Sequence, residues 1–101
     1  MSKKFKIPKS IKVGAIDYKI EIVHLENNED GDTLLGHCDY VTNTIQINEK
    51  SSKERQEQTL YHELVHAILF ESSNVEFEDN ERLVDSLGLM LHQIIKNNKL
   101  G

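Results

Sequence analysis

The stretch TLYHELVHAILF, residues 59–70, places two histidines inside an apolar segment. Residues at i and i+4 lie on one face of a helix, so His62 and His66 can reach the same small cation. Polar groups are costly to bury unless they have a partner, and a metal ion is one such partner. We therefore predict a metal-binding helix here. A chance pairing on an exposed helix is the alternative, since the chain holds five histidines.

With Glu63 beside the first histidine, the pattern becomes His-Glu-x-x-His, which is known from metalloproteases. A catalytic zinc takes three protein ligands and keeps its fourth position for water, whose pKa falls to about 7. Glu63 is then expected to point at that water and to remove its proton. The pattern predicts Zn²⁺ as the cofactor, His62 and His66 as two of its ligands, and Glu63 as the general base.

A third ligand must come from elsewhere, and Glu81 is our first candidate. Glu81 and Asp85 stand at i and i+4 near the start of a second predicted helix, so they share a face. Glu81 would coordinate zinc. Asp85, one turn further on, would accept the second ring N–H of His62 and so fix its tautomer. Two ordinary acids favoured by the dipole at a helix amino terminus are the alternative.

His37 and Cys38 are a competing source of the third ligand, because zinc accepts both residue types. Neighbours on a strand point to opposite faces, so only one of them could reach the site. A closed site that includes Cys38 would be structural and would lack the open position that hydrolysis needs. We expect instead that Cys38 is a small core residue and that His37 is exposed.

Three further side chains are candidate hydrogen-bond donors to the reacting carbonyl: His92, Tyr40 and Tyr61. His92 falls nearly on the helix face of Asp85, and ordinary packing is the alternative for all three. Gly88 shares the same face. A glycine inside a helix costs stability relative to alanine, so we expect close approach of the first helix at that position.

Strand signals dominate the first half of the chain. Isoleucine and tyrosine alternate with charged residues over 16–22, which predicts a half-buried strand. Ile11 and Val13 precede it across a Gly14–Ala15 turn and suggest a hairpin. Residues 34–40 and 44–48 predict a second pair of strands, turning near residues 42–43. In the last strand, Ile45 and Ile47 are expected to face the core, and Gln46 and Asn48 to face away.

Helix signals dominate the second half. Ser51 and Glu54 fit a capping box that would start the first helix. Residues 72–74 break the pattern, and a second helix is predicted from about Asp79 to Asn97. The core stripe of the first helix is predicted as Leu60, Leu64, Ala67 and Ile68, and the apolar face of the second as Leu83, Leu87, Met90, Leu91 and Ile94. Four short strands followed by two helices predict an α+β fold over a single domain, residues 1–101, with the strand order open.

Composition narrows the functional classes. Twelve basic and seventeen acidic residues give a net charge of -5, which argues against a general affinity for nucleic acid. The single cysteine excludes an internal disulfide. The basic amino terminus is followed by no apolar segment, and no stretch approaches the roughly 20 apolar residues of a membrane span. We therefore expect a soluble, cytoplasmic protein with no membrane partner.

Taken together, His62, Glu63, His66, Glu81 and Asp85 make the chain resemble zincin-type metallopeptidases of the gluzincin kind, in which HExxH is followed downstream by Glu-x-x-x-Asp. More narrowly, it resembles the small ImmA/IrrE-like metallopeptidases often carried by bacteriophages and other mobile elements. The similarity extends to the strands at 36–40 and 44–47. It implies a zinc-dependent peptidase with a small mixed sheet packed on the active-site helix. Some relatives cleave repressor proteins. The interval from His66 to Glu81 is short here, which is a departure from those relatives, so the resemblance does not assign a repressor as the substrate.

The leading hypothesis is hydrolysis of a peptide bond in a protein or peptide substrate. The substrate strand is expected to add to a sheet edge around Thr44–Asn48 through main-chain hydrogen bonds. A non-catalytic interaction module with a structural zinc site is the alternative from another class. A DNA-dependent protease of the SprT type also carries HExxH, but the net acidity and the lack of a zinc ribbon disfavour it.

Overall fold

Strands precede helices along residues 6–99, the part of the chain that this computed structural model describes. This order confirms the predicted α+β class. The elements are β1 (Ser10–Val13), β2 (Ile16–Val23), β3 (Gly36–Asp39), β4 (Thr44–Asn48), α1 (Lys53–Glu71), α2 (Val75–Glu78) and α3 (Glu81–Asn97).

The strands form one mixed sheet with the order β1-β2-β4-β3. β1 and β2 are an antiparallel hairpin with Val13 opposite Ile16, as the Gly14–Ala15 turn predicted. β2 and β4 are parallel, and β4 and β3 are antiparallel. β4 is therefore paired on both sides. The prediction that Thr44–Asn48 offers a free edge is wrong, and β3 is the edge strand on that side of the sheet.

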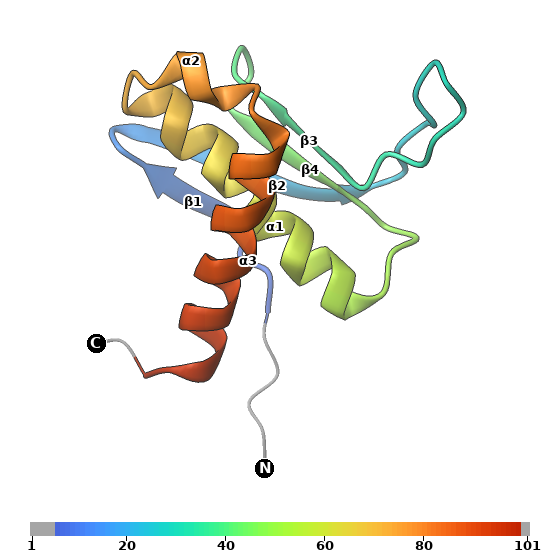
Figure 1. The fold of residues 1–101 in the computed structure, drawn as a ribbon. Helices are drawn as coiled ribbons and strands as arrows, with labels where there is room; N and C mark the ends of the chain where they lie inside the picture. Colours follow the sequence, from blue (N-terminus) through green and yellow to red (C-terminus); the bar gives the residue numbers. More distant parts are fainter. Residues whose placement is uncertain (1–5, 100–101) are drawn as a thin grey trace.

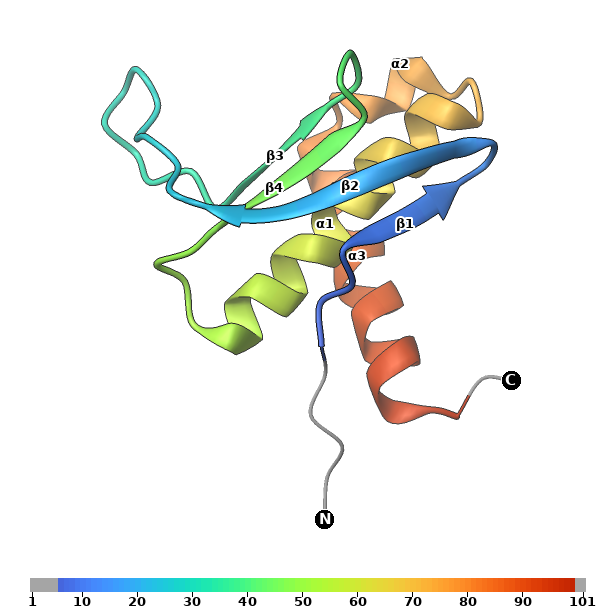
Figure 2. The ribbon, with the colours of Figure 1, turned by 180° about the vertical axis from the view of Figure 1, so that it is seen from behind.

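Three layers stack in the order sheet, α1, α3. Figure 1 shows α3 crossing in front of α1, and Figure 2, from behind, shows the sheet covering the opposite side of α1. The connection between β2 and β3, residues 24–35, projects beyond the sheet. α1 is thus the central element, and any side chain near its midpoint can contact either the sheet or α3.

The core lies between the sheet and α1. Ile45 and Ile47 are fully buried, as predicted, and Asn48, which was expected to face away from the core, is buried as well. The buried amide of Asn48 has partners in the flanking loops: Nδ2 donates to the Leu34 carbonyl at 2.8 Å and Oδ1 accepts from the Lys50 amide at 2.9 Å. The core cluster consists of Val13, Tyr18, Ile20, Ile45, Ile47, Leu60, Tyr61, Leu64 and Ala67.

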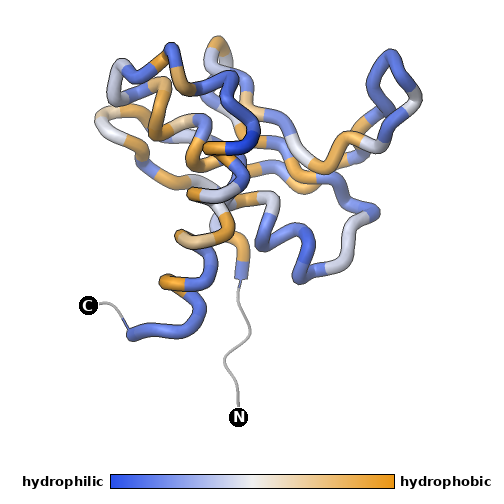
Figure 3. Tube along the Cα trace, viewed as in Figure 1, coloured by the Kyte–Doolittle hydropathy of each residue, from blue (hydrophilic) through white to orange (hydrophobic). Residues whose placement is uncertain are grey.

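α1 begins one residue later than predicted. The Ser52 hydroxyl oxygen accepts from the Arg55 amide at 3.2 Å and caps the helix. The predicted capping box at Ser51 is wrong, because the Ser51 amide donates to the Asn48 carbonyl in the turn after β4. Figure 3 shows hydrophilic residues over the first turns of α1 and hydrophobic ones further along. Leu60, Leu64 and Ala67 are buried as predicted, whereas Ile68 is 44% exposed and lies outside the core.

Only part of the predicted apolar face of α3 packs inward, since Leu91 is half-buried against the core cluster. Leu87, Met90 and Ile94 are 44%, 56% and 41% exposed, whereas Val84 and Gly88 are buried. A Cβ atom at Gly88 would lie 3.1 Å from the His62 Cα atom. The small residues therefore let the two helix backbones approach closely, which confirms the expectation for Gly88. Leu87, Met90 and Ile94 are left outside because α3 has α1, and no sheet, beneath it.

The break at residues 72–74 is confirmed by the end of α1 at Glu71. The short helix α2 follows it and was not predicted. The side chain of Asn80 then caps α3 by accepting from the Leu83 amide at 3.1 Å, so α3 begins at Glu81 rather than near Asp79. The end of α2 and the start of α3 thereby place Glu78 and Glu81 beside His66 of α1.

Across residues 6–99, every helix is too short or too polar to cross a lipid bilayer.

Replacing Gly88 tests the contact between the helices. Gly88→Val should lower the free energy of unfolding by about 1–3 kcal/mol, because the new side chain must push apart two packed backbones. Urea unfolding measures the change. Gln93→Val introduces the same residue at an exposed position of α3 and should stay within about 0.5 kcal/mol of the parent chain. Equal stability of the two variants would contradict the close packing.

Candidate metal centre

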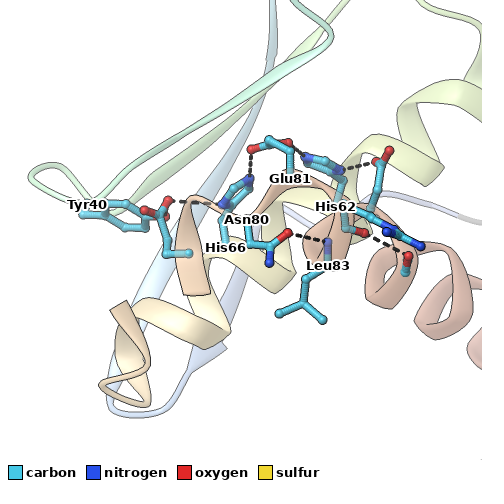
Figure 4. Close-up of polar contacts among 10 residues, drawn as sticks. Tyr40, His62, His66, Asn80, Glu81 and Leu83 are labelled. Carbon is cyan, nitrogen blue, oxygen red and sulfur yellow. Dashed lines mark hydrogen bonds and ion pairs between the residues drawn. The ribbon is translucent and has the colours of Figure 1, made fainter. Parts of the chain in front are cut away.

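Three side chains of the types that bind metals meet between α1 and α3. Nε2 of His62 lies 3.3 Å from one carboxylate oxygen of Glu81, and Nε2 of His66 lies 3.1 Å from the other. The two imidazole rings meet edge to face with their centroids 5.1 Å apart. Figure 4 shows the Glu81 carboxylate facing both rings. The structure thus brings together the three residues that the sequence nominated as ligands.

The spacing of these atoms fits a small tetrahedral cation. Ligand atoms about 2.1 Å from a tetrahedral zinc lie roughly 3.4 Å from one another. The candidate atoms of His62, His66 and Glu81 all lie within 4.8 Å of one another, so small side-chain rotations reach that spacing. Two imidazole nitrogens and one carboxylate oxygen are also a donor set of catalytic zinc sites. The residues present therefore fit the ion that the sequence pattern implies.

Asp85 holds the ring of His62 from behind. Nδ1 of His62 lies 2.9 Å from a carboxylate oxygen of Asp85, at hydrogen-bond distance. With its Nδ1–H donated to Asp85, the ring carries its lone pair on Nε2, the atom that faces Glu81. Asp85 thus contacts the histidine that the sequence analysis assigned to it.

Glu78 occupies the equivalent place behind His66. Its Oε1 lies 3.1 Å from Nδ1 of His66 and accepts a hydrogen bond from the Tyr40 hydroxyl at 2.5 Å. The contact to Nδ1 has an ion-pair distance but not the angle of a hydrogen bond, so this buried nitrogen has no aligned acceptor among residues 6–99. The Tyr40 ring is held in turn by stacking on Phe70, with centroids 4.1 Å apart. Each candidate ligand histidine therefore has its own carboxylate.

Sequence reasoning missed Glu78. It lies in α2, a helix of four residues, and its neighbours give no period that would assign its side chain to a face. One usable signal was present. Glu78 stands three residues before Glu81, in the short connection that must bring α3 back to α1.

Glu63 is 7% exposed and lies next to the candidate ligands. Burial, together with the charges of Glu81 and Glu78, raises the pKa of Glu63 to about 8. A cation between the histidines would act in the opposite direction, because a nearby positive charge favours the carboxylate. Gly36 makes room for this acid: a Cβ atom there would lie 3.1 Å from Glu63 Oε2 and 2.5 Å from Thr59 Cγ2.

The site opens into a cleft between α1 and the edge strand β3. Two adjoining cavities, of about 320 Å³ and about 420 Å³, make up this cleft. The smaller one contains the three candidate ligands together with Tyr40 and Glu78. The larger one continues past His62 towards the start of α1. Their shared walls are Leu34, Gly36, His62 and Glu63.

The competing ligands lie outside the three-residue cluster. His37 is exposed, as expected. Cys38 is half-buried on the wall of the smaller cavity. Burial, followed by the charge of Glu63, raises the pKa of the Cys38 thiol to about 12.

The three candidate hydrogen-bond donors have different surroundings. Nε2 of His92 lies 2.7 Å from a carboxylate oxygen of Glu57 on the first half of α1, so His92 is engaged away from the ligand cluster. Tyr61 is buried and stacks on His92 with centroids 5.2 Å apart. Of these three candidate donors, Tyr40 is the one that lines the cavity of the candidate ligands.

The sheet, the HExxH helix and the acidic partner helix together describe a peptidase-type domain. The sequence matches the Peptidase M78 family, the IrrE N-terminal-like domain, over residues 16–85. The chain belongs to this family. The matched range runs from the first residue of β2 to Asp85 and so includes all five residues nominated for the site. No curated protein and no solved structure matches the chain.

Glu78 provides a test of the ring contacts. Glu78→Gln removes the negative charge next to Nδ1 of His66, and we expect zinc affinity to fall by about 10- to 100-fold. Competition with a chromogenic chelator measures the dissociation constant. Glu76→Gln is the matched control, because Glu76 is exposed on the same short helix. Similar zinc affinities for both variants would show that Glu78 does not support His66.

Proposed function

We propose that this protein is a zinc-dependent peptidase in which His62, His66 and Glu81 hold the metal and Glu63 is the general base. The observation that carries the proposal is the convergence of both Nε2 atoms and the Glu81 carboxylate beside a buried fourth side chain, Glu63, on one open cavity. A site with a purely structural metal has no need of a free carboxylate in that position. Membership of a peptidase family supports the same conclusion.

Zinc, when bound, would supply a Lewis acid that polarises the scissile carbonyl and lowers the pKa of water. The remaining chemistry belongs to the chain. Glu63 takes a proton from water as the water oxygen attacks the carbonyl carbon, and it later delivers that proton to the departing amine as the C–N bond breaks. Asp85 keeps the Nδ1–H of His62 occupied, and Glu78 has the matching position at His66. Gly36 lets β3 pass close to Glu63.

The substrate we propose is an extended segment of a protein or peptide. β3 is an edge strand whose outer side borders the cleft, so its free main-chain groups can pair with an added strand. This replaces the edge at Thr44–Asn48 that the sequence suggested. We propose no nucleic-acid partner, because the net charge of -5 opposes binding to phosphate backbones.

Glu63→Gln tests the assignment of the base. The amide cannot accept a proton, so peptide hydrolysis should fall by about 10²- to 10⁴-fold while one zinc per chain is retained. Product formation followed by mass spectrometry, with metal analysis of the same sample, measures both quantities. Glu54→Gln, at an exposed position of α1, makes the same chemical change outside the site and should leave both unaltered. Full activity in Glu63→Gln would rule out this mechanism.

Removing the metal separates a catalytic zinc from a structural one. The core cluster is made of apolar side chains from β1, β2, β4 and α1, and the three candidate ligands lie outside it. EDTA should therefore abolish hydrolysis while the circular dichroism of the folded chain persists. The midpoint of thermal unfolding should fall by a few degrees, because a ligand that binds the native state stabilises it. Unfolding on addition of EDTA would favour the structural alternative.

A further inference from the structure

The larger cavity carries a charged group that the proposed mechanism does not use. This cavity, of about 420 Å³, extends along α1 from His62 to Arg55. Arg55 is the one lysine or arginine among its wall residues. The Arg55 Nη1 atom donates to the Gln58 side-chain oxygen at 2.8 Å. Within residues 6–99, no carboxylate lies at ion-pair distance from it.

The unmatched charge is notable in a chain with a net charge of -5. The acidic groups of this cavity, Glu63 and Asp85, lie at its other end beside His62. Arg55 therefore faces the cavity as a guanidinium without an acidic partner. A guanidinium presents a planar set of donors that matches a carboxylate. The walls of the same cavity include Leu34, Leu35 and Leu89, which suits an uncharged stretch of peptide leading up to that carboxylate.

Helix geometry sets the distance between this charge and the reacting bond. Arg55 precedes His62 by seven residues, so the two lie on nearly the same face of α1, about 10 Å apart along its axis. An extended peptide advances about 3.3 Å per residue and covers that distance in about three residues. Because the arginine side chain is long, a carboxylate two residues from the scissile bond can also reach it. The substrate carboxylate would therefore lie two or three residues from the scissile bond.

The direction of β3 decides whether this carboxylate lies before or after the scissile bond in the substrate. β3 runs in the same direction as α1: Gly36 lies against Thr59 and Glu63, whereas Tyr40, further along the chain, stacks on Phe70. The larger cavity is bordered by residues 33–36, before and at the start of β3. Antiparallel pairs are the commoner kind in proteins. A strand added antiparallel to β3 would place its residues after the scissile bond along 33–36 and towards Arg55.

We propose that Arg55 recognises a substrate carboxylate two or three residues after the scissile bond. The carboxylate can belong to an Asp or Glu side chain or to the carboxyl terminus of the substrate, because a guanidinium binds both in the same way. The inference rests on the proposed peptidase function and assigns its substrate class: segments that are acidic, or that end, shortly after the cleaved bond.

A cleavage survey tests the preference. The zinc-loaded full chain and its Arg55→Glu variant are incubated with a synthetic peptide library, prepared with free and with amidated carboxyl termini, and the products are sequenced by mass spectrometry. The wild-type chain should prefer Asp or Glu over Asn or Gln at the second or third position after the cut by about three- to tenfold. Arg55→Glu should reverse this preference towards Lys or Arg. Preference confined to free termini would assign the carboxylate to the chain end.

Lys53→Glu is the matched control, because it makes the same change of charge at an exposed position in the first turn of α1, outside the cavity wall. This variant should keep the wild-type preference. Cleavage without an acidic preference, or a preference that Arg55→Glu leaves unaltered, would overturn the inference while leaving the peptidase function standing. An acidic preference before the cut would overturn the proposed direction and with it the assignment.

Binding supplies a second measurement that does not depend on turnover. Fluorescence anisotropy with labelled peptides gives the dissociation constant of Glu63→Gln, with and without Arg55→Glu. In a series of peptides, a single Glu is moved from one position to the next, and each peptide is compared with its Gln counterpart. At one position only, the Glu peptide should bind the Glu63→Gln chain about three- to tenfold more tightly. The added Arg55→Glu change should remove that difference. Equal binding of Glu and Gln peptides throughout would reject the role of Arg55, whether or not cleavage is detected.

Discussion

The candidate site depends on the close approach of α3 to α1. Gly88 lies against the backbone of His62, where a Cβ atom would meet the His62 Cα atom at 3.1 Å. Glu81 and Asp85 precede this contact on the same face of α3, at intervals of about two turns and one turn. Once the backbones touch at Gly88, both carboxylates are directed at the histidine face of α1. A bulkier residue at the contact would move the acids away from the rings without altering either helix sequence that carries the chemistry.

The second constraint is electrostatic. Three acids, Glu63, Glu78 and Glu81, surround two imidazoles at the wall of one cavity. Burial of Glu63, followed by the charges of Glu81 and Glu78, raises its pKa to about 8 and so favours its protonated form. A divalent cation between the rings would offset the repulsion among these acids and lower the pKa of Glu63, which favours the carboxylate form that the proposed base needs. The same arrangement therefore suits both the proposed metal site and the proposed base, with Asp85 and Glu78 placed beside Nδ1 of His62 and His66.

Much of the site could be predicted because its parts repeat at helical spacing. His62 with His66, and Glu81 with Asp85, are pairs four residues apart, and each pair shares a helix face whatever the rest of the chain does. Predictions that depended on a neighbouring element were less successful. Leu87 and Met90 were assigned to the core on period alone, but α3 contacts α1 through Val84 and Gly88 instead. Nothing local distinguishes those two faces, because the choice depends on how near the helix backbones can come.

The sequence by itself determined the α+β class, the HExxH helix and the pairing of its histidines with acids on the following helix. Only the tertiary structure decided that β4 is interior and β3 is the edge, that Glu78 stands behind His66, and that Arg55 faces the far end of the same cleft. The physical reason is the range of the interactions. Helical and strand periods are set by bonds within a few residues, whereas strand order and the wall of a cleft depend on surfaces that meet only after the chain has folded.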